Sequence, residues 1–290
     1  MTGLTRAGVA VAGLGLAFGV ALLAGAAVPR VHDDAALAQA RHGHDGDGVA
    51  AHGGAHAAGA PAGLAVAEDG LRLVAAATTV PAGRAVTWRF RIVGPDGRAV
   101  TRFDVEHERR MHLIVVRRDL TGYRHLHPAM APDGTWSVRL RLGGPGVHRA
   151  YADFATGGAA HTLATDLLAP GAFAPRPLPA PAAVDRADGY AARLATGDLR
   201  AGAPAALDYR ITRDGHPVDG VEPYLGADGH LVALREGDLA FLHVHPEPSD
   251  DPATIRFGAT LPSAGRYRLF LQFKHDGAVR TVAHTVVVRR

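Results

Sequence analysis

Cysteine is absent from the 290-residue chain, and this absence excludes more chemistry than any other feature of the composition. A chain without thiols has no disulfides, no zinc–thiolate site, no iron–sulfur cluster held by thiolates, no cysteine nucleophile and no blue-copper centre with a cysteine ligand. Signatures of common enzyme classes are missing as well, since the sequence contains no GxSxG, HExxH or P-loop motif. We therefore expect a binding protein rather than an enzyme.

A strong net charge is also lacking, because the chain carries only +3 when histidine is neutral. The arginines are scattered through alternating stretches such as "WRFRIV" and "SVRLRL", which is typical of the solvent face of β-strands. We accordingly expect no nucleic-acid partner. A hydrophobic content of 47% and a charged content of 20% indicate a globular chain. The residue that is unusually abundant is histidine, with 17 copies.

The first 63 residues form two segments of different composition. Residues 7–28 are uncharged, follow Arg6 and include a small-residue triplet at 24–26, which predicts a signal peptide or single-span membrane anchor within residues 1–29. Either reading places the rest of the chain outside the cytoplasm, secreted or anchored to the cell membrane. Residues 30–63 are rich in Gly, Ala, His and Asp and predict a disordered tether. Its histidines make it either a loose metal-collecting tract or a solvated linker: His42, His44, His52 and His56.

The remainder of the chain repeats itself. His112 and His230 are 118 residues apart, and Phe154 and Phe273 are 119 apart, which predicts two copies of one domain. We place the copies at residues 64–168 and 184–290, joined by a Pro-rich linker at 169–183. Short alternating stretches are separated by turn signals, with no stretch of 3.6-residue period long enough for a helix. The predicted fold is all-β, with two tandem β-sandwiches of immunoglobulin-like or cupredoxin-like type.

Each copy carries three histidines at the same spacing, in "HLIVVRRDLTGYRHLHP" and "HLVALREGDLAFLHVHP". In the second copy, Gly-Asp at 237–238 suits a two-residue hairpin turn, which pairs residues whose numbers add up to 475. The corresponding sum in the first copy is 239. These registers place all three histidines of a copy on one face, close enough to converge on one ion at about 2 Å. We predict two equivalent, independent metal sites: His112, His125 and His127, and His230, His243 and His245.

A buried hydrogen-bond network is the competing interpretation of these histidines. The 17 aligned positions share only six identical residues, of which three are the histidines, and this favours metal ligands. Further ligands or supporting groups are available nearby: Glu106, His107, Met111 and Met130 in the first copy, and Glu222 and Asp228 in the second. We interpret Trp136, Phe154 and Phe273 as core residues, and His161, His275 and His284 as surface residues.

The segments "HERRMHLIVVRRDLTGYRHLHPAMAPDGTW" and "EPYLGADGHLVALREGDLAFLHVHPE", followed by "AGRYRLFLQFKHDGAVRTVAHTVVV", carry a resemblance to a known group of proteins. They resemble secreted or membrane-anchored bacterial envelope proteins associated with copper and other heavy-metal homeostasis. The resemblance covers roughly residues 65–290 and carries over only to the six histidines of the two triads. It implies extracytoplasmic metal handling on a β-sandwich core.

These features together predict an extracytoplasmic protein that binds copper, or alternatively zinc. It would sequester the ion or pass it to an envelope metal transporter or chaperone. Two other functions stay open. The tandem sandwiches could be a cell-surface interaction module with structural histidines, or a three-histidine zinc site with an open position could hydrolyse a substrate. Metal retention by protein lacking residues 1–63 would separate these readings.

Overall fold

The computed structural model describes residues 61–218, 220–251 and 253–290. The regular secondary structure in these ranges consists of β-strands only, and every pairing between named strands is antiparallel. No helix with the length and hydropathy needed to cross a membrane occurs in these ranges. The predicted all-β fold of two tandem sandwiches is confirmed, whereas the predicted N-terminal segment and nearly all of the tether lie outside the described residues.

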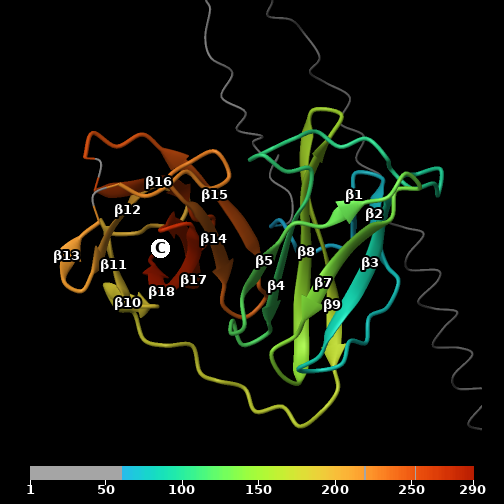
Figure 1. Cartoon of the computed structure of the whole chain (residues 1–290), viewed down its shortest axis with the longest axis horizontal. Helices are drawn as coiled ribbons and strands as arrows, with labels where there is room; N and C mark the ends of the chain where they lie inside the picture. The colour runs from blue at the N-terminus through green and yellow to red at the C-terminus, as the bar shows by residue number, and fades with distance from the viewer. Residues whose placement is uncertain (1–60, 219, 252) are drawn as a thin grey trace, which may run out of the picture. The chain divides into compact units, whose positions relative to one another are not determined.

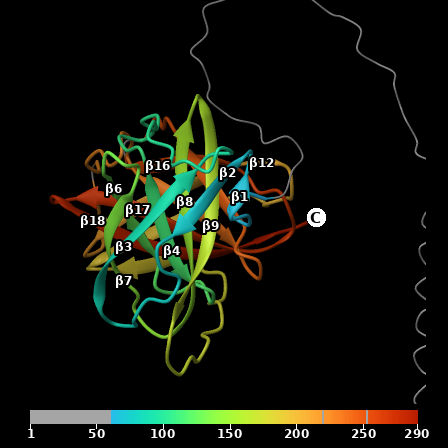
Figure 2. The same cartoon turned by 90° about the vertical axis from the view of Figure 1, so that its right-hand side faces the viewer.

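The first copy is a sandwich of two separate sheets (Figure 1). One sheet has the order β1 (Ala67–Glu68), β2 (Leu71–Ala75), β3 (Ala85–Val93), β7 (Trp136–Arg141), β6 (Ala129–Met130). The other has the order β5 (Arg124–Leu126), β4 (His112–Arg117), β8 (Gly146–Thr156), β9 (Ala159–Ala169). Both sheets contribute to one apolar core, which includes Trp136 and Phe154 as predicted. The long β8–β9 hairpin is visible from both directions (Figures 1 and 2).

The second copy wraps a single sheet around its own core. The order is β10 (Val184–Ala187), β11 (Tyr190–Thr196), β12 (Pro204–Arg213), β16 (Thr254–Thr260), β15 (Phe241–Glu247), β14 (His230–Arg235), β17 (Gly265–His275), β18 (Ala278–Val288), with β13 (His216–Pro217) beside β12. Strand β15 joins the two layers, because Val244 pairs with β14 and His245 with β16. In the first copy the equivalent segment is divided into β5 and β6. The HxHP segment is thus where the chain passes between layers.

Both predicted hairpin registers are confirmed. Val232 pairs with His243 in the second copy, and Ile114 pairs with His125 in the first. The predicted two-residue Gly-Asp turn was wrong, since β14 and β15 are joined by a longer loop over residues 236–240. Asp238 organises this loop by binding the Arg235 guanidinium and the Ala240 amide. The register survives because the loop closes on a hydrogen bond from the Arg235 amide to the Ala240 carbonyl.

Strands β4 and β14 are buried on both faces, which explains their uninterrupted apolar runs "LIVV" and "LVAL". An antiparallel strand with one solvent face alternates polar and apolar residues instead. Leu113 belongs to the first core and Leu231 to the second. The alternate residues of both strands meet in a third apolar cluster, which we call the joint. Its buried members are Ile114, Val116, Leu120, Tyr151, Ala164, Val232, Leu234, Leu239, Phe241 and Phe270.

Contacts across the joint are reciprocal, so that equivalent residues of the two copies exchange roles. Tyr123 stacks on Phe270 with ring centres 4.3 Å apart. The equivalent positions, Phe241 and Tyr151, also contact each other, with ring centres 5.2 Å apart. The Tyr151 hydroxyl additionally donates a buried hydrogen bond of 2.7 Å to the Leu239 carbonyl of the other copy. The joint is therefore a packed and hydrogen-bonded interface inside one chain.

We expect Tyr151→Phe to lower the free energy of unfolding by about 1–3 kcal/mol, because it leaves the buried Leu239 carbonyl without its donor. The matched control is Tyr209→Phe, since the buried Tyr209 hydroxyl has no hydrogen-bond partner among the described residues. Urea unfolding of both variants measures the difference. Equal stabilities for the two variants would contradict the contribution of the hydrogen bond across the joint.

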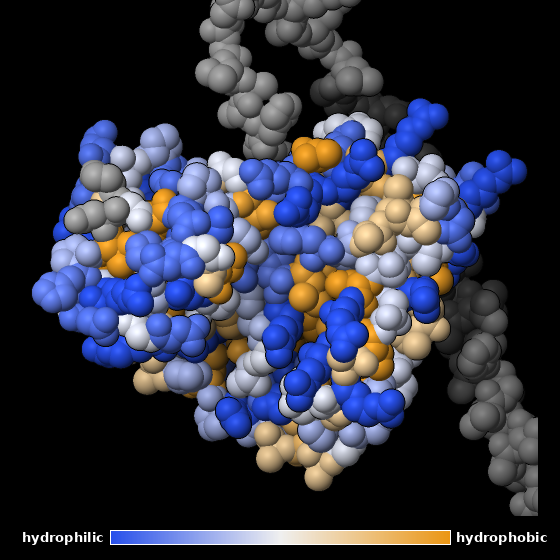
Figure 3. Space-filling model, viewed as in Figure 1, coloured by the Kyte–Doolittle hydropathy of each residue, from blue (hydrophilic) through white to orange (hydrophobic). Residues whose placement is uncertain are grey.

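The outer surface follows the predicted alternation of arginine and apolar residues. Arg89 and Arg91 on β3 and Arg139 and Arg141 on β7 are exposed, while Phe90 and Leu140 between them are buried. Hydrophilic residues cover much of the face in Figure 3, with apolar residues interspersed. The solvent side of these strands is thus confirmed.

Candidate metal centre

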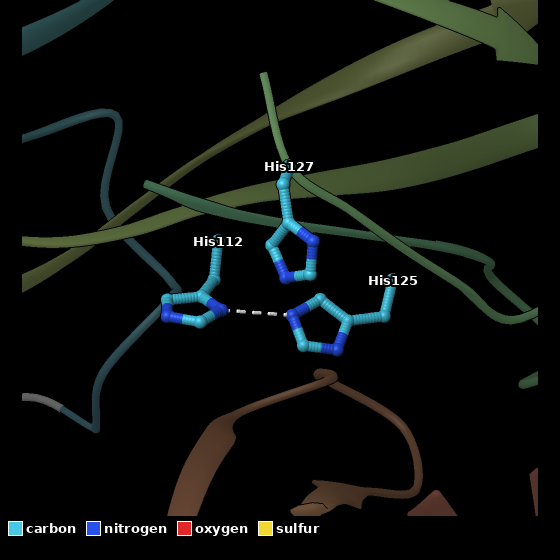
Figure 4. Close-up of side chains that lie close together, drawn as sticks. All are labelled: His112, His125 and His127. Carbon is cyan, nitrogen blue, oxygen red and sulfur yellow. Dashed lines mark hydrogen bonds between the residues drawn. The ribbon is translucent and has the colours of Figure 1, made fainter. Parts of the chain in front are cut away.

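The three histidines of the first copy converge at one end of β4. His112 opens β4, His125 lies on β5, and His127 follows β5 directly. One nitrogen from each ring can be chosen so that all three lie within 4.8 Å of one another. His112 Nδ1 and His125 Nε2 are 3.0 Å apart, and the third ring faces this pair (Figure 4). We call these three residues the triad.

The ring spacing of the triad matches what one ion requires. A tetrahedral ion with metal–nitrogen bonds of about 2.0–2.1 Å holds its nitrogens about 3.3 Å apart and the attached ring centres about 5 Å apart. The ring centres of His112 and His125 are 5.2 Å apart, and those of His112 and His127 are also 5.2 Å apart. The remaining pair, His125 and His127, is separated by 4.8 Å. An ion could therefore enter with little rearrangement.

Hydrogen bonds on the far side of two rings determine which nitrogen faces the centre. His112 Nε2 lies 3.1 Å from the Glu106 carbonyl oxygen, which can only accept, so this nitrogen carries the proton. His125 Nδ1 lies 2.7 Å from Gln272 Oε1 and donates to it in the same way. In the neutral rings, Nδ1 of His112 and Nε2 of His125 are then both lone-pair nitrogens. They face each other at 3.0 Å, so either one ring gains a proton and donates to the other, or a metal ion lies between them.

His127 completes the group with a nitrogen that is buried and has no hydrogen-bond partner among the described residues, Nε2. Burial, and then repulsion from His112 when that ring is protonated and from Arg109, lower the pKa of His127 to about 4. The ring is therefore neutral near pH 7 and its lone pair is available to a metal ion.

One histidine of the second copy, His230, adjoins the triad. His230 is buried on β14, and its ring stacks on His125 with centres 4.4 Å apart and lies 6.0 Å from His112. His243 pairs with Val232 on β14, and His245 is exposed on β15. The sequence predicted independent sites, but His230 lies against the triad despite the Pro-rich linker between the copies. Among the described residues only the triad forms a group of three converging ligands, so a second site stays a prediction.

The additional ligand candidates have other contacts. The carboxylate of Glu222 binds Lys274 at 2.8 Å and the Gly277 amide, which occupies it as an ion-pair partner. His107 lies near the triad, with its ring centre 6.2 Å from that of His112. Met111 is buried in the first core, yet it lines a surface pocket of about 300 Å³ together with Met130, Pro128 and Trp136. Two residues of its lining are sequence neighbours of the triad, since Met111 precedes His112 and Pro128 follows His127.

The prediction that His161 and His284 are surface residues was wrong. Both are buried, with 7% and 2% of their surface exposed. His284 lies on β18 near the Ala192 carbonyl, and burial lowers its pKa, so it is a neutral core residue. His275 is partly buried against the Tyr190 hydroxyl. His161 on β9 and His284 on β18 lie at positions that face the interior. The prediction failed because it relied on the absence of an equivalent histidine in the other copy.

Comparison with known proteins identifies the repeated unit. A family model described as a domain of unknown function, DUF8832, matches the chain twice, over residues 65–171 and 184–290. No curated protein is detectably similar in sequence. None of these findings concerns copper.

Solved structures resemble the chain only distantly. The Escherichia coli adhesin FdeC is 14% identical, with 78% of this chain and 66% of that one covered and a TM-score of 0.26. Invasin, a bacterial integrin-binding protein, is 15% identical, with 77% and 41% covered and a TM-score of 0.25. A chimeric titin Z1Z2 tandem is 14% identical, with 74% and 95% covered and a TM-score of 0.20. The chain thus spans only part of the first two proteins, and scores this low support no argument about function.

Proposed function

The chain belongs to the DUF8832 family, with two copies of its domain, and we propose that it binds a metal ion through His112, His125 and His127. The observation that carries this proposal is the convergence of one nitrogen from each ring within 4.8 Å, with two nitrogens 3.0 Å apart and His127 Nε2 buried without a hydrogen-bond partner among the described residues. A hydrogen-bonded structural cluster would require one ring of the close pair to be protonated, and it would still leave His127 Nε2 without a partner among the described residues. A metal ion satisfies all three nitrogens at once.

Copper is the ion that this ligand set favours. Imidazole suits copper, zinc, iron and nickel, and a site of given ligands binds divalent copper most tightly along the first-row series. Zinc is the alternative, because three histidines also form zinc sites.

The proposed role is extracytoplasmic. The protein would be secreted or held at the membrane by residues 1–29, and it would sequester the ion or pass it to an envelope metal transporter or chaperone. We propose binding rather than catalysis, since the sequence supplies no enzyme motif beside the triad. A surface interaction module with structural histidines is the competing function. It fits the tandem sandwiches about as well and differs in requiring no metal.

Metal titration followed by elemental analysis separates these functions. Protein lacking residues 1–60 keeps every described strand and loses the tether histidines. The metal-binding proposal expects this protein to retain copper after desalting, whereas the interaction module expects none to remain. Retention of zinc in preference to copper would reassign the ion but keep the site.

The affinity for metal should fall between about pH 7 and pH 5, because protons compete with the ion for imidazole lone pairs. The pKa of His127 is already lowered to about 4, so protonation of this ring does not contribute over that interval. A plot of log Kd against pH should therefore show the loss of at most two protons per ion. A flat plot would indicate that carboxylates, and not the triad, hold the ion.

A further inference from the structure

Two side chains of the second copy lie against the triad of the first. Gln272 Oε1 is 2.7 Å from His125 Nδ1, and the His230 ring stacks on His125. Gln272 and His230 are paired across β17 and β14, and both are buried. In Figure 4 a ribbon of the second copy runs beside the His125 end of the group. The proposed ion site is thus bounded by both copies.

The orientation of the Gln272 amide follows from its other contact. Its Nε2 lies 3.3 Å from Thr281 Oγ1 on β18, which directs Oε1 to His125. An amide oxygen accepts and cannot donate, so the proton of neutral His125 is held on Nδ1. The lone pair is then on Nε2, the nitrogen that faces His112 Nδ1 at 3.0 Å. A different tautomer of His125 would turn an N–H toward the centre and block the ion.

We propose that Gln272 is a positioning residue for the metal site, so that the second copy prepares the triad of the first. The proposal rests on the proposed function, because it assigns the residue that sets the tautomer of one ligand. Groups that accept a hydrogen bond from a metal-bound histidine typically contribute a factor of about 10–100 to metal affinity. Both domains would then contribute to the ion site, although all three ligands of the triad come from the first.

The same residue can be changed in two directions. Gln272→Leu removes the acceptor at nearly constant size, and the affinity of the full-length protein for Cu²⁺ should fall about 10–100-fold. Gln272→Glu retains an acceptor and adds negative charge, and the affinity should equal or exceed that of the wild type. Binding by the tether is measured in a His112→Ala, His125→Ala, His127→Ala variant and subtracted from every titration.

Nitrogen NMR of the metal-free proteins provides the second readout. The wild type should show His125 protonated at Nδ1, and Gln272→Leu should show a mixture of tautomers. A Gln272→Leu variant with wild-type affinity, or one whose His125 tautomer is unchanged, would overturn the proposal. Failure of the proposed function itself looks different, since wild type and the triad-free variant would then bind Cu²⁺ equally.

Discussion

Replacing His125 and His127 with alanine should abolish high-affinity metal binding by the folded domains. Loss of one supporting group typically costs about 10–100-fold in affinity, so loss of two of three ligands should cost at least the upper end of that range. A ligand at about 100 times its Kd stabilises the native state by about 2.7 kcal/mol. Thermal unfolding with and without Cu²⁺ should therefore show a large increase in Tm for the wild type and almost none for the double variant.

Two matched variants define the specificity of this effect. His216→Ala changes an exposed histidine on β13 and should leave the metal-induced increase in Tm intact. His243→Ala with His245→Ala tests the predicted second site, and it should halve the metal stoichiometry of protein lacking the tether if that site exists. Equal metal-induced stabilisation of wild type and the His125, His127 variant would exclude the triad. The tether would then be the metal-binding element.

Replacing Phe270 with alanine should lower the free energy of unfolding by about 3–5 kcal/mol, the usual cost of a cavity of this size. Phe270 is 4% exposed and packs against Tyr123 across the joint. The cavity lies between the copies and not inside either core. We therefore expect the two copies to unfold less cooperatively, in addition to the loss of stability. Calorimetry should show one unfolding transition for the wild type and two for Phe270→Ala.

The control for Phe270→Ala is Phe173→Ala. Phe173 is 41% exposed, and the Arg117 guanidinium lies 5.1 Å from its ring centre. Its removal should cost less than about 1 kcal/mol and leave a single transition. Two transitions in the wild type would contradict the joint as a stabilising interface.

Much of the triad could be predicted from sequence because strand geometry is periodic. The spacing of His112, His125 and His127 and the position of the loop fix the register, and the register fixes the face. The type of turn mattered less, since the longer loop at 236–240 closes on the same pairs. The same histidine spacing in the second copy predicted the register of its β14–β15 hairpin.

The contact between the copies was not predicted, although the sequence contains a signal for it. The run "LIVV" after His112 does not alternate, and a non-alternating run indicates a strand buried on both faces. Ile114 shares a face with His112, so the second buried face is also the face of the triad. The sequence pattern of a strand does not show which surface packs against its second buried face. Here that contact includes His125 with Gln272, which are 147 positions apart.

The reciprocal contacts of the joint have a consequence for how such a chain can diversify. A single copy could form the same contact with a second molecule, as a two-fold symmetric dimer in which equivalent positions hold identical residues. Within one chain, the linker replaces that bimolecular encounter with an effective concentration on the order of millimolar. Because both copies belong to one chain, equivalent positions can also hold different residues. The position paired with the first histidine of β4 or β14 is Asp153 in one copy and Gln272 in the other, a difference that a homodimer cannot encode.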